Sequence, residues 1–307
     1  MISRDFRRLW CGQAVSSVGD KVFATTLVLW VSQQLAGGRW WAPVAVSGIL
    51  VATGAAAILA GPVAGVLIDR WNRVTVMTLT EAIRAVLTAG LTGLSFLPAR
   101  DLPAWLWLTA MYAAVFLLGA CGQFFTLAQL AVTGDLVHGE AAQARAASIT
   151  EATVSAAGMI GPPIAAPLML AVGPQWALAA NAASYVVSCL ITWSLRAAVG
   201  PPAPRHRAKA GLRAEFADGL RIFAQNKYVF ALLSVTVICQ TGTAAITTLN
   251  VFFLTTSLHA PASLYGTAEM AMGAGFIAGA LAAGPLVRRA GARAVTWSGL
   301  FAAGTLT

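Results

Sequence analysis

The sequence predicts an all-α polytopic membrane protein, and three observations lead to this prediction. Of the 307 residues, 58% are hydrophobic and only 10% are charged, whereas soluble domains carry about 25% charged residues. Apolar runs of about 20 residues, the length that crosses a hydrocarbon core, recur along the whole chain. The positive charges gather in alternate loops, as expected when successive helices cross a bilayer in opposite directions.

The apolar runs predict helical spans in order along the chain. Six spans are expected before a polar interruption, at 10–35, 42–68, 74–97, 103–133, 147–172 and 175–197. Two more are expected at 228–257 and 262–287, and a ninth begins near 294. We therefore expect about nine spans, with the chain appearing truncated inside the ninth.

The interruption divides the chain into an N-terminal six-helix transmembrane half, 1–197, a cytoplasmic linker, 198–227, and a partial C-terminal transmembrane half, 228–307. The linker begins with the Pro-rich, basic string PPAPRHRAK. It continues with apolar residues at helical spacing, which predict an amphipathic helix at the membrane surface. A shift of the chain by 219 residues lays GVLIDRWN over GPLVRRAG. This weak repeat, at the end of the second span of each half, favours the same boundary.

The distribution of Lys and Arg predicts the orientation of the chain. Sixteen of the 20 lie in the N-terminal tail and in the loops after even-numbered spans, and only Arg39 and Arg100 lie in the opposite loops. The positive-inside rule then places the N-terminus in the cytoplasm of a multi-pass protein of the cell inner (plasma) membrane. The net charge of +9 follows from this topology, so no nucleic-acid partner is expected.

Motifs typical of enzymes are missing from the sequence. It contains no P-loop and no nucleophile elbow, and its three histidines, His138, His206 and His259, fall in separate loops. A metal site needs several ligands close together. The sequence therefore predicts no enzyme, no metal site and no cofactor.

The loop after the second span combines glycine, acid and arginine at short spacing, in Gly65, Asp69, Arg70 and Arg73. This pattern resembles the loop 2-3 signature of the major facilitator superfamily. The resemblance implies the major facilitator fold, with a six-span N-terminal half plus an incomplete C-terminal half, and a cytoplasmic gate formed by this loop. We expect Gly65 to let a neighbouring helix approach closely. The alternative is a simple hairpin, which explains the arginines but not the acid. Asn72 stands where the family usually has glycine.

The fifth span holds the string AGMIGPPIAAPLM. It is similar to the antiporter signature of exporters in this superfamily, matched at Gly161, Pro162, Ala165 and Ala166. The resemblance implies that this helix helps to close the cytoplasmic route, whereas the alternative is a plain packing kink. The strings FRRLWCGQAVSSVGDKVF and FADGLRIFAQNKYVFALL look like members of the macrolide-efflux and enterobactin-exporter-like branch. The fourth span departs from many proton-coupled drug antiporters, because it carries no arginine.

Charged residues inside apolar spans are candidate functional groups, because each costs about 2.5–3.5 kcal/mol at the bilayer centre. Asp20 and its neighbour Lys21 lie near the middle of the first span. Since the first span lines the central cavity in the superfamily, the resemblance implies that Asp20 binds a proton or a cationic substrate. The alternative is a buried Asp20 that pairs for structure alone with Lys21 or another helix. Glu81 and Arg84, three residues apart, share a helix face and are expected to form a structural ion pair.

Uncharged polar residues and one further acid complete the predicted proton and substrate cavity. Beside Asp20 and Lys21, the predicted cavity residues are Gln123, Gln240, Asn250 and Glu269.

Together these features predict a secondary active transmembrane exporter, a proton antiporter of amphipathic small molecules such as drugs or siderophores. Its mechanism is expected to be alternating access, and its partners are the lipid bilayer, the small-molecule substrate and protons, with the chain acting as a monomer. The alternatives are a solute importer of the same fold and a nontransporting, truncated membrane fragment.

Overall fold

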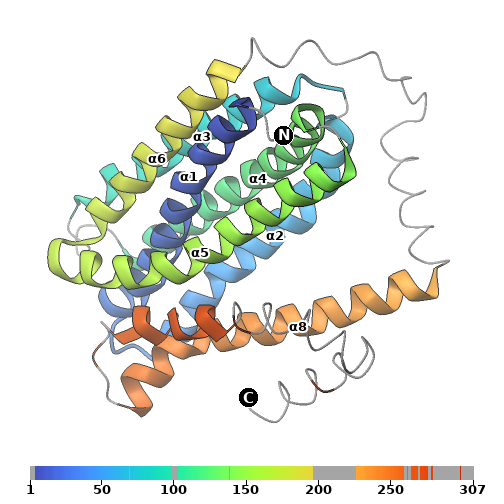
Figure 1. Ribbon diagram of the computed structural model, residues 1–307. Coiled ribbons are helices and arrows are strands. Elements are labelled where there is room, and N and C mark those ends of the chain that lie inside the picture. The colour runs from blue at the N-terminus through green and yellow to red at the C-terminus, as the bar shows by residue number, and fades with distance from the viewer. Residues whose placement is uncertain are drawn as a thin grey trace.

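The computed structural model describes residues 4–68, 70–97, 103–137, 139–195, 226–258, 261, 264–268, 270–275, 278 and 298. Every regular element in these ranges is a helix (Figure 1). The helices are α1 (Arg4–Trp30), η1 (Val31–Leu35), α2 (Ala42–Ile68), α3 (Arg73–Ser95), α4 (Ala104–Leu136), α5 (Glu140–Val172), α6 (Pro174–Ser194), α8 (Lys227–Phe252) and η3 (Phe253–Ser257). The elements η1 and η3 are π-helical turns that continue α1 and α8.

Six of the described helices, α1 to α6, are long and apolar enough to cross a membrane. They correspond to the first six predicted spans. α1 begins at Arg4 and α5 at Glu140, which is six or seven residues before the predicted spans at 10 and 147. The reason is that a helix can continue into the polar interface, where hydropathy gives no signal. Such polar helix ends are invisible to a search for apolar runs.

The seventh predicted span coincides with α8, which has 26 residues, about 39 Å of helix. Several side chains of α8 lie outside the described residues, so its assignment as a membrane span stays a prediction. The eighth predicted span is described only in part, and the ninth almost entirely lies outside the described residues. The count of nine spans therefore stays a prediction, as does the linker, since 198–225 lies outside the described residues as well.

The six long helices form one bundle, with α8 along one side of it (Figure 1). α1 packs against α5 and α6, α3 packs against α4 and α6, and α2 packs against α4. α8 contacts α2. In the largest buried cluster the ring of Trp30 meets that of Trp107 edge to face, with 5.5 Å between the centroids. Helices far apart in sequence, such as α1 and α6, are thereby brought into contact.

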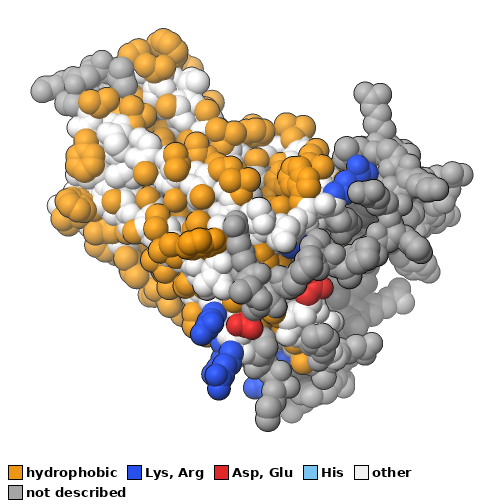
Figure 2. Space-filling view, turned by 90° about the horizontal axis from the view of Figure 1, so that it is seen from above, with side chains coloured by type: hydrophobic (Ala, Val, Ile, Leu, Met, Phe, Trp, Pro, Cys, Tyr) orange, Lys and Arg blue, Asp and Glu red, His pale blue; other side chains and the backbone are white. Residues whose placement is uncertain are grey.

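The outer surface of the bundle is apolar. Figure 2 shows a broad area of hydrophobic side chains, with the described charged side chains lying outside it. Ile58 is 74% exposed and Val86 is 71% exposed. Soluble proteins rarely expose apolar patches of this extent, whereas lipid-facing helix surfaces are apolar. The exposed surface therefore fits a bundle whose solvent is the bilayer.

Candidate functional site

A charged cluster joins α1, α3 and α6 in the interior of the bundle. The Nη2 atom of Arg84 donates to Asp20 Oδ2 at 2.9 Å and to the Tyr185 hydroxyl at 2.8 Å. The Tyr185 hydroxyl in turn donates to Asp20 Oδ1. The guanidinium also stacks on the Tyr185 ring, with Cζ 4.2 Å from the centroid. The three side chains therefore form a closed ring of charge-assisted hydrogen bonds, which are stronger than neutral ones.

Glu81 adds a second carboxylate to this cluster. Its Oε1 lies 3.3 Å from Arg84 Nη1, one turn along the same helix. Glu81 is completely buried, whereas the Asp20 side chain is 37% exposed. A buried charge that loses its partner is costly, so one guanidinium compensates two carboxylates of very different accessibility. Asp20 is therefore the more accessible of the two carboxylates.

The cluster lies near the middle of the first span, which runs from Arg4 to Leu35. The sequence pattern predicts Asp20 and the Glu81–Arg84 pair as two separate features. The structure unites them, because α1 and α3 both pack against α6. Tyr185, which binds both Asp20 and Arg84, is missing from the residues predicted from sequence. A tyrosine hydroxyl in the middle of an apolar span was the available signal, since such a group needs a partner.

Lys21 does not join its neighbour Asp20. It is exposed, and its backbone and Cβ lie against Gly161 of α5, where an added Cβ would come 2.5 Å from Lys21 Cβ. Gly158 lies one turn away on the same face, 3.9 Å from Lys21 Cε by the same measure. Within the described residues, no carboxylate lies within 4.0 Å of the Lys21 ammonium. Lys21 therefore presents an accessible cation near the middle of the span.

The Gly-Pro string of α5 packs on two sides. Gly161 meets α1, as described above, and Ala165 and Ala166 are fully buried. On the other side, a Cβ added to Gly266 would come 2.5 Å from the Pro162 carbonyl oxygen. Small residues thus permit close backbone approach at this level of α5. The structure shows the packing, and a role in closing a route through the protein stays a prediction.

The other predicted cavity residues are Gln123, Asn250, Gln240 and Glu269, and the structure describes them only in part. Gln123 on α4 is half-buried, with its Oε1 3.7 Å from the place of a Cβ on Gly61 of α2. Asn250 is half-buried on α8. Gln240 lies on α8, but its side chain is outside the described residues, as is Glu269. Their place in a cavity stays a prediction.

The predicted gate loop connects α2 to α3. Arg73 forms an ion pair with Asp135 near the end of α4, with 2.5 Å between Nη1 and Oδ2. Asn72 caps α3, because its Oδ1 accepts from the Thr75 N–H at 3.1 Å. This cap explains why asparagine suits the position at which the resemblance led us to expect glycine. Asp135 was not among the predicted gate residues, and its contact needs the tertiary structure to be seen.

Two further predictions concern Asp69 and Gly65 of this loop. Asp69 lies outside the described residues, so its role as the acid of the gate stays a prediction. No described residue approaches Gly65 closely, so the predicted close approach of a helix there stays a prediction. A Cβ added there meets nothing within 4 Å, because Gly65 is on the exposed side of α2. Arg70, in the loop after α2, is also exposed.

Comparison with known proteins places these features in a family. The sequence profile of the Major Facilitator Superfamily matches residues 9–307. Macrolide efflux protein A of Streptococcus pyogenes is 27% identical over 233 residues, which are 75% of this chain and 54% of that protein. The putative bacilysin exporter BacE of Bacillus subtilis is 27% identical over 222 residues, which are 71% of this chain and 50% of that protein. The chain thus spans about half the length of these relatives.

Proposed function

Because the chain belongs to the major facilitator superfamily, we propose that it acts as a secondary active exporter of amphipathic small molecules, driven by proton antiport. The proposal extends to a plasma-membrane location with the N-terminus in the cytoplasm and to alternating access of a cavity near the bilayer midplane. The similarity to a macrolide efflux protein and a putative bacilysin exporter supports export over the alternative, uptake of a solute.

One observation carries the coupling part of this proposal, namely the accessible Asp20 carboxylate held by Arg84 and Tyr185 in the interior of the bundle. Ionisable residues within membrane spans mark proton and substrate pathways. Protonation of Asp20 removes the negative charge that Arg84 binds, so proton uptake and the cluster's geometry are linked. A substrate cation near Asp20 would compete for the same carboxylate, which is the requirement for exchange.

Lys21 supports a substrate with an acidic or polar portion as well as an apolar one. Lys21 follows Asp20 in sequence, but its exposed side chain lies on the side of α1 that packs against α5. A carboxylate, hydroxyl or carbonyl group of a substrate can accept its hydrogen bonds. An acid and a base on neighbouring faces of α1 would orient a zwitterionic or amphipathic molecule.

The test is transport by the purified chain in proteoliposomes, with a macrolide such as erythromycin as the first probe and bacilysin as the second. We expect uptake into inside-out vesicles when the lumen is acidic, and its loss when an ionophore collapses the pH gradient. Asp20→Asn should abolish the gradient-driven part, while Glu151→Gln, an exposed acid of α5, serves as the matched control. Equal accumulation with and without the gradient would refute proton antiport. Transport of neither probe in either direction would refute export of this substrate class.

A further inference from the structure

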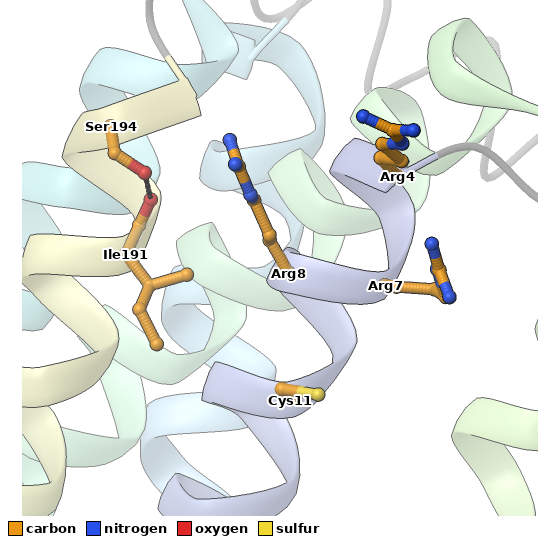
Figure 3. A pocket seen from close by; sticks show the side chains of 6 residues that line it. All are labelled: Arg4, Arg7, Arg8, Cys11, Ile191 and Ser194. Carbon is orange, nitrogen blue, oxygen red and sulfur yellow. Dashed lines mark hydrogen bonds between the residues drawn. The ribbon is translucent and has the colours of Figure 1, made fainter.

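Three arginines line a pocket at the N-terminal end of α1 (Figure 3). The pocket has a volume of about 560 Å³. Its lining residues come from two helices, with Arg4, Arg7, Arg8 and Cys11 on α1 and with Ile191 and Ser194 on α6. It is separate from the charged cluster described above, to which none of these six residues belongs.

α1 contributes arginines to the pocket, and α6 contributes the apolar side chain of Ile191. Arg8 extends into the gap between α1 and α6, whereas Arg7 is turned away from α6 (Figure 3). Ile191 packs over Gly12, where an added Cβ would come 3.2 Å from the isoleucine side chain. The Ser194 hydroxyl donates to the Ile191 carbonyl at 2.6 Å. The proton of the Ser194 hydroxyl is thus used within α6, so the donors available to a ligand are those of the arginines.

The positive charge of the pocket is poorly compensated. Asp5 lies 3.9 Å from Arg8, and both side chains are partly exposed, at 34% and 66%. Such an exposed pair is weak. Within the described residues, no carboxylate lies within 4.0 Å of Arg4 or Arg7. An anion in the gap between α1 and α6 therefore meets the guanidinium of Arg8, with those of Arg4 and Arg7 on the same end of α1 and little competition from carboxylates (Figure 3).

The position of the pocket in the bilayer identifies the class of anion. Arg4 begins a candidate membrane span of 32 residues, about 48 Å of helix. Because the hydrocarbon core is only about 30 Å thick, we expect the arginines in the first turns of this span to lie among the lipid headgroups. One helical turn deeper than Cys11 and Ile191, Val15 is 52% exposed and Val187 is 44% exposed. The basic pocket between α1 and α6 is thus followed, deeper along the two helices, by an apolar surface at Val15 and Val187. This order of charge and hydrocarbon matches a lipid better than it matches a soluble anion.

We propose that this pocket binds the headgroup of an anionic phospholipid, with an acyl chain of the same lipid lying over Val15 and Val187. Arginine binds phosphate through paired N–H groups, and basic pockets between membrane helices are suited to anionic headgroups. The site is independent of the proposed transport cycle, because it uses none of the residues assigned to coupling. It gives α1 and α6 a shared lipid ligand at one membrane surface.

The test is lipid binding by the purified chain in detergent, measured by native mass spectrometry. The probes are dioleoyl-phosphatidylglycerol, dioleoyl-phosphatidylcholine and inorganic phosphate. We expect one tightly retained phosphatidylglycerol per chain, with phosphatidylcholine held much more weakly. The triple substitution Arg4→Gln, Arg7→Gln and Arg8→Gln should weaken phosphatidylglycerol at least about tenfold, since each basic residue near the surface contributes to such binding. Arg145→Gln is the matched control, because Arg145 is an exposed arginine at the N-terminal part of α5 outside the pocket.

A second variant keeps the test decisive if the triple substitution disturbs folding. Ser194→Trp fills part of the pocket and leaves every charge in place, so it should also weaken phosphatidylglycerol while circular dichroism stays unchanged. The proposal is overturned if phosphatidylglycerol binds the pocket variants as tightly as the wild-type chain, or if Arg145→Gln weakens it equally. Tight binding of inorganic phosphate alone would overturn the lipid assignment as well.

Discussion

Arg84 of α3 bonds Asp20 of α1 at 2.9 Å and lies 3.3 Å from Glu81 of its own helix. This one guanidinium therefore joins a carboxylate that is accessible to one that is completely buried. Because Arg84 pairs with both acids, a change in the charge of Asp20 also changes the electrostatic environment of Glu81. The link gives the first prediction.

Replacement of Arg84 by glutamine should destabilise the protein strongly. The substitution leaves two carboxylates without their cation, and breaking a buried ion pair from one side costs about 3–5 kcal/mol. We expect a large loss in thermal stability of the purified protein, measured by the monodisperse fraction after heating. The double variant Arg84→Gln, Glu81→Gln should recover part of this loss. Equal stability of Arg84→Gln and the wild-type chain would show that the ion pairs are unimportant.

Replacement of Tyr185 by phenylalanine separates the hydrogen bonds of the cluster from its packing. The ring and its contact with the Arg84 guanidinium remain, but the hydroxyl that joins Arg84 to Asp20 is lost. We expect a loss of about 1–3 kcal/mol, typical of hydrogen bonds to charged groups. Transport in proteoliposomes should slow without losing its dependence on the pH gradient. Complete uncoupling by this variant would assign to Tyr185 the role proposed for Asp20.

A methyl group at Gly161 should separate α1 from α5. A Cβ there would lie 2.5 Å from Lys21 Cβ and 3.3 Å from the backbone of Lys21 and Val22. Backbone cannot yield as a flexible side chain can, so Gly161→Ala should cost about 1–3 kcal/mol in overpacking. Gly122→Ala on α4 is the control, because a Cβ there meets nothing within 4 Å among the described residues. If both variants melt at the same temperature, the close contact at Gly161 has no energetic role.

The Arg73–Asp135 ion pair is expected to act in the proposed gate more than in stability. The Asp135 side chain is 42% exposed, and pairs exposed to this degree contribute about 0–1 kcal/mol. Asp135→Asn should therefore leave thermal stability nearly unchanged while lowering the transport rate severalfold. Asn72→Asp, which preserves the cap on α3, should transport normally. A normal rate for Asp135→Asn would leave the ion pair without a part in gating.

The proposed orientation can be tested without a substrate. In a chain whose native cysteines are replaced, single cysteines are placed at Trp40 and Trp71, which are 88% and 49% exposed. These positions lie in loops at opposite ends of α2, so they are expected on opposite sides of the membrane. A membrane-impermeant thiol reagent added to intact cells should label position 40 and spare position 71. The reverse labelling would invert the proposed topology.

The sequence was sufficient for features that depend on local spacing. The lengths of the apolar runs predict the six long helices, and the spacing of Glu81 and Arg84 places both on one helix face. It was insufficient for contacts between distant segments. The partners of Arg84 on α1 and α6 are 64 and 101 residues away along the chain, and no local pattern specifies which helices pack together. The surroundings of Gly65 could not be predicted for the same reason, because a glycine in a helix does not reveal whether a neighbour faces it.

The three prolines within α5 have a mechanical consequence. Pro162, Pro163 and Pro167 lie inside a helix of 33 residues, and each lacks the N–H that would bond to the carbonyl four residues earlier. The carbonyls of Gly158, Met159 and Pro163 are thereby left without their usual intrahelical donors. A change in the curvature of α5 at this level need not break those three bonds, so its elastic resistance to bending is low where Gly161 meets α1. Bending α5 about this point therefore breaks fewer hydrogen bonds than bending it where it has no proline.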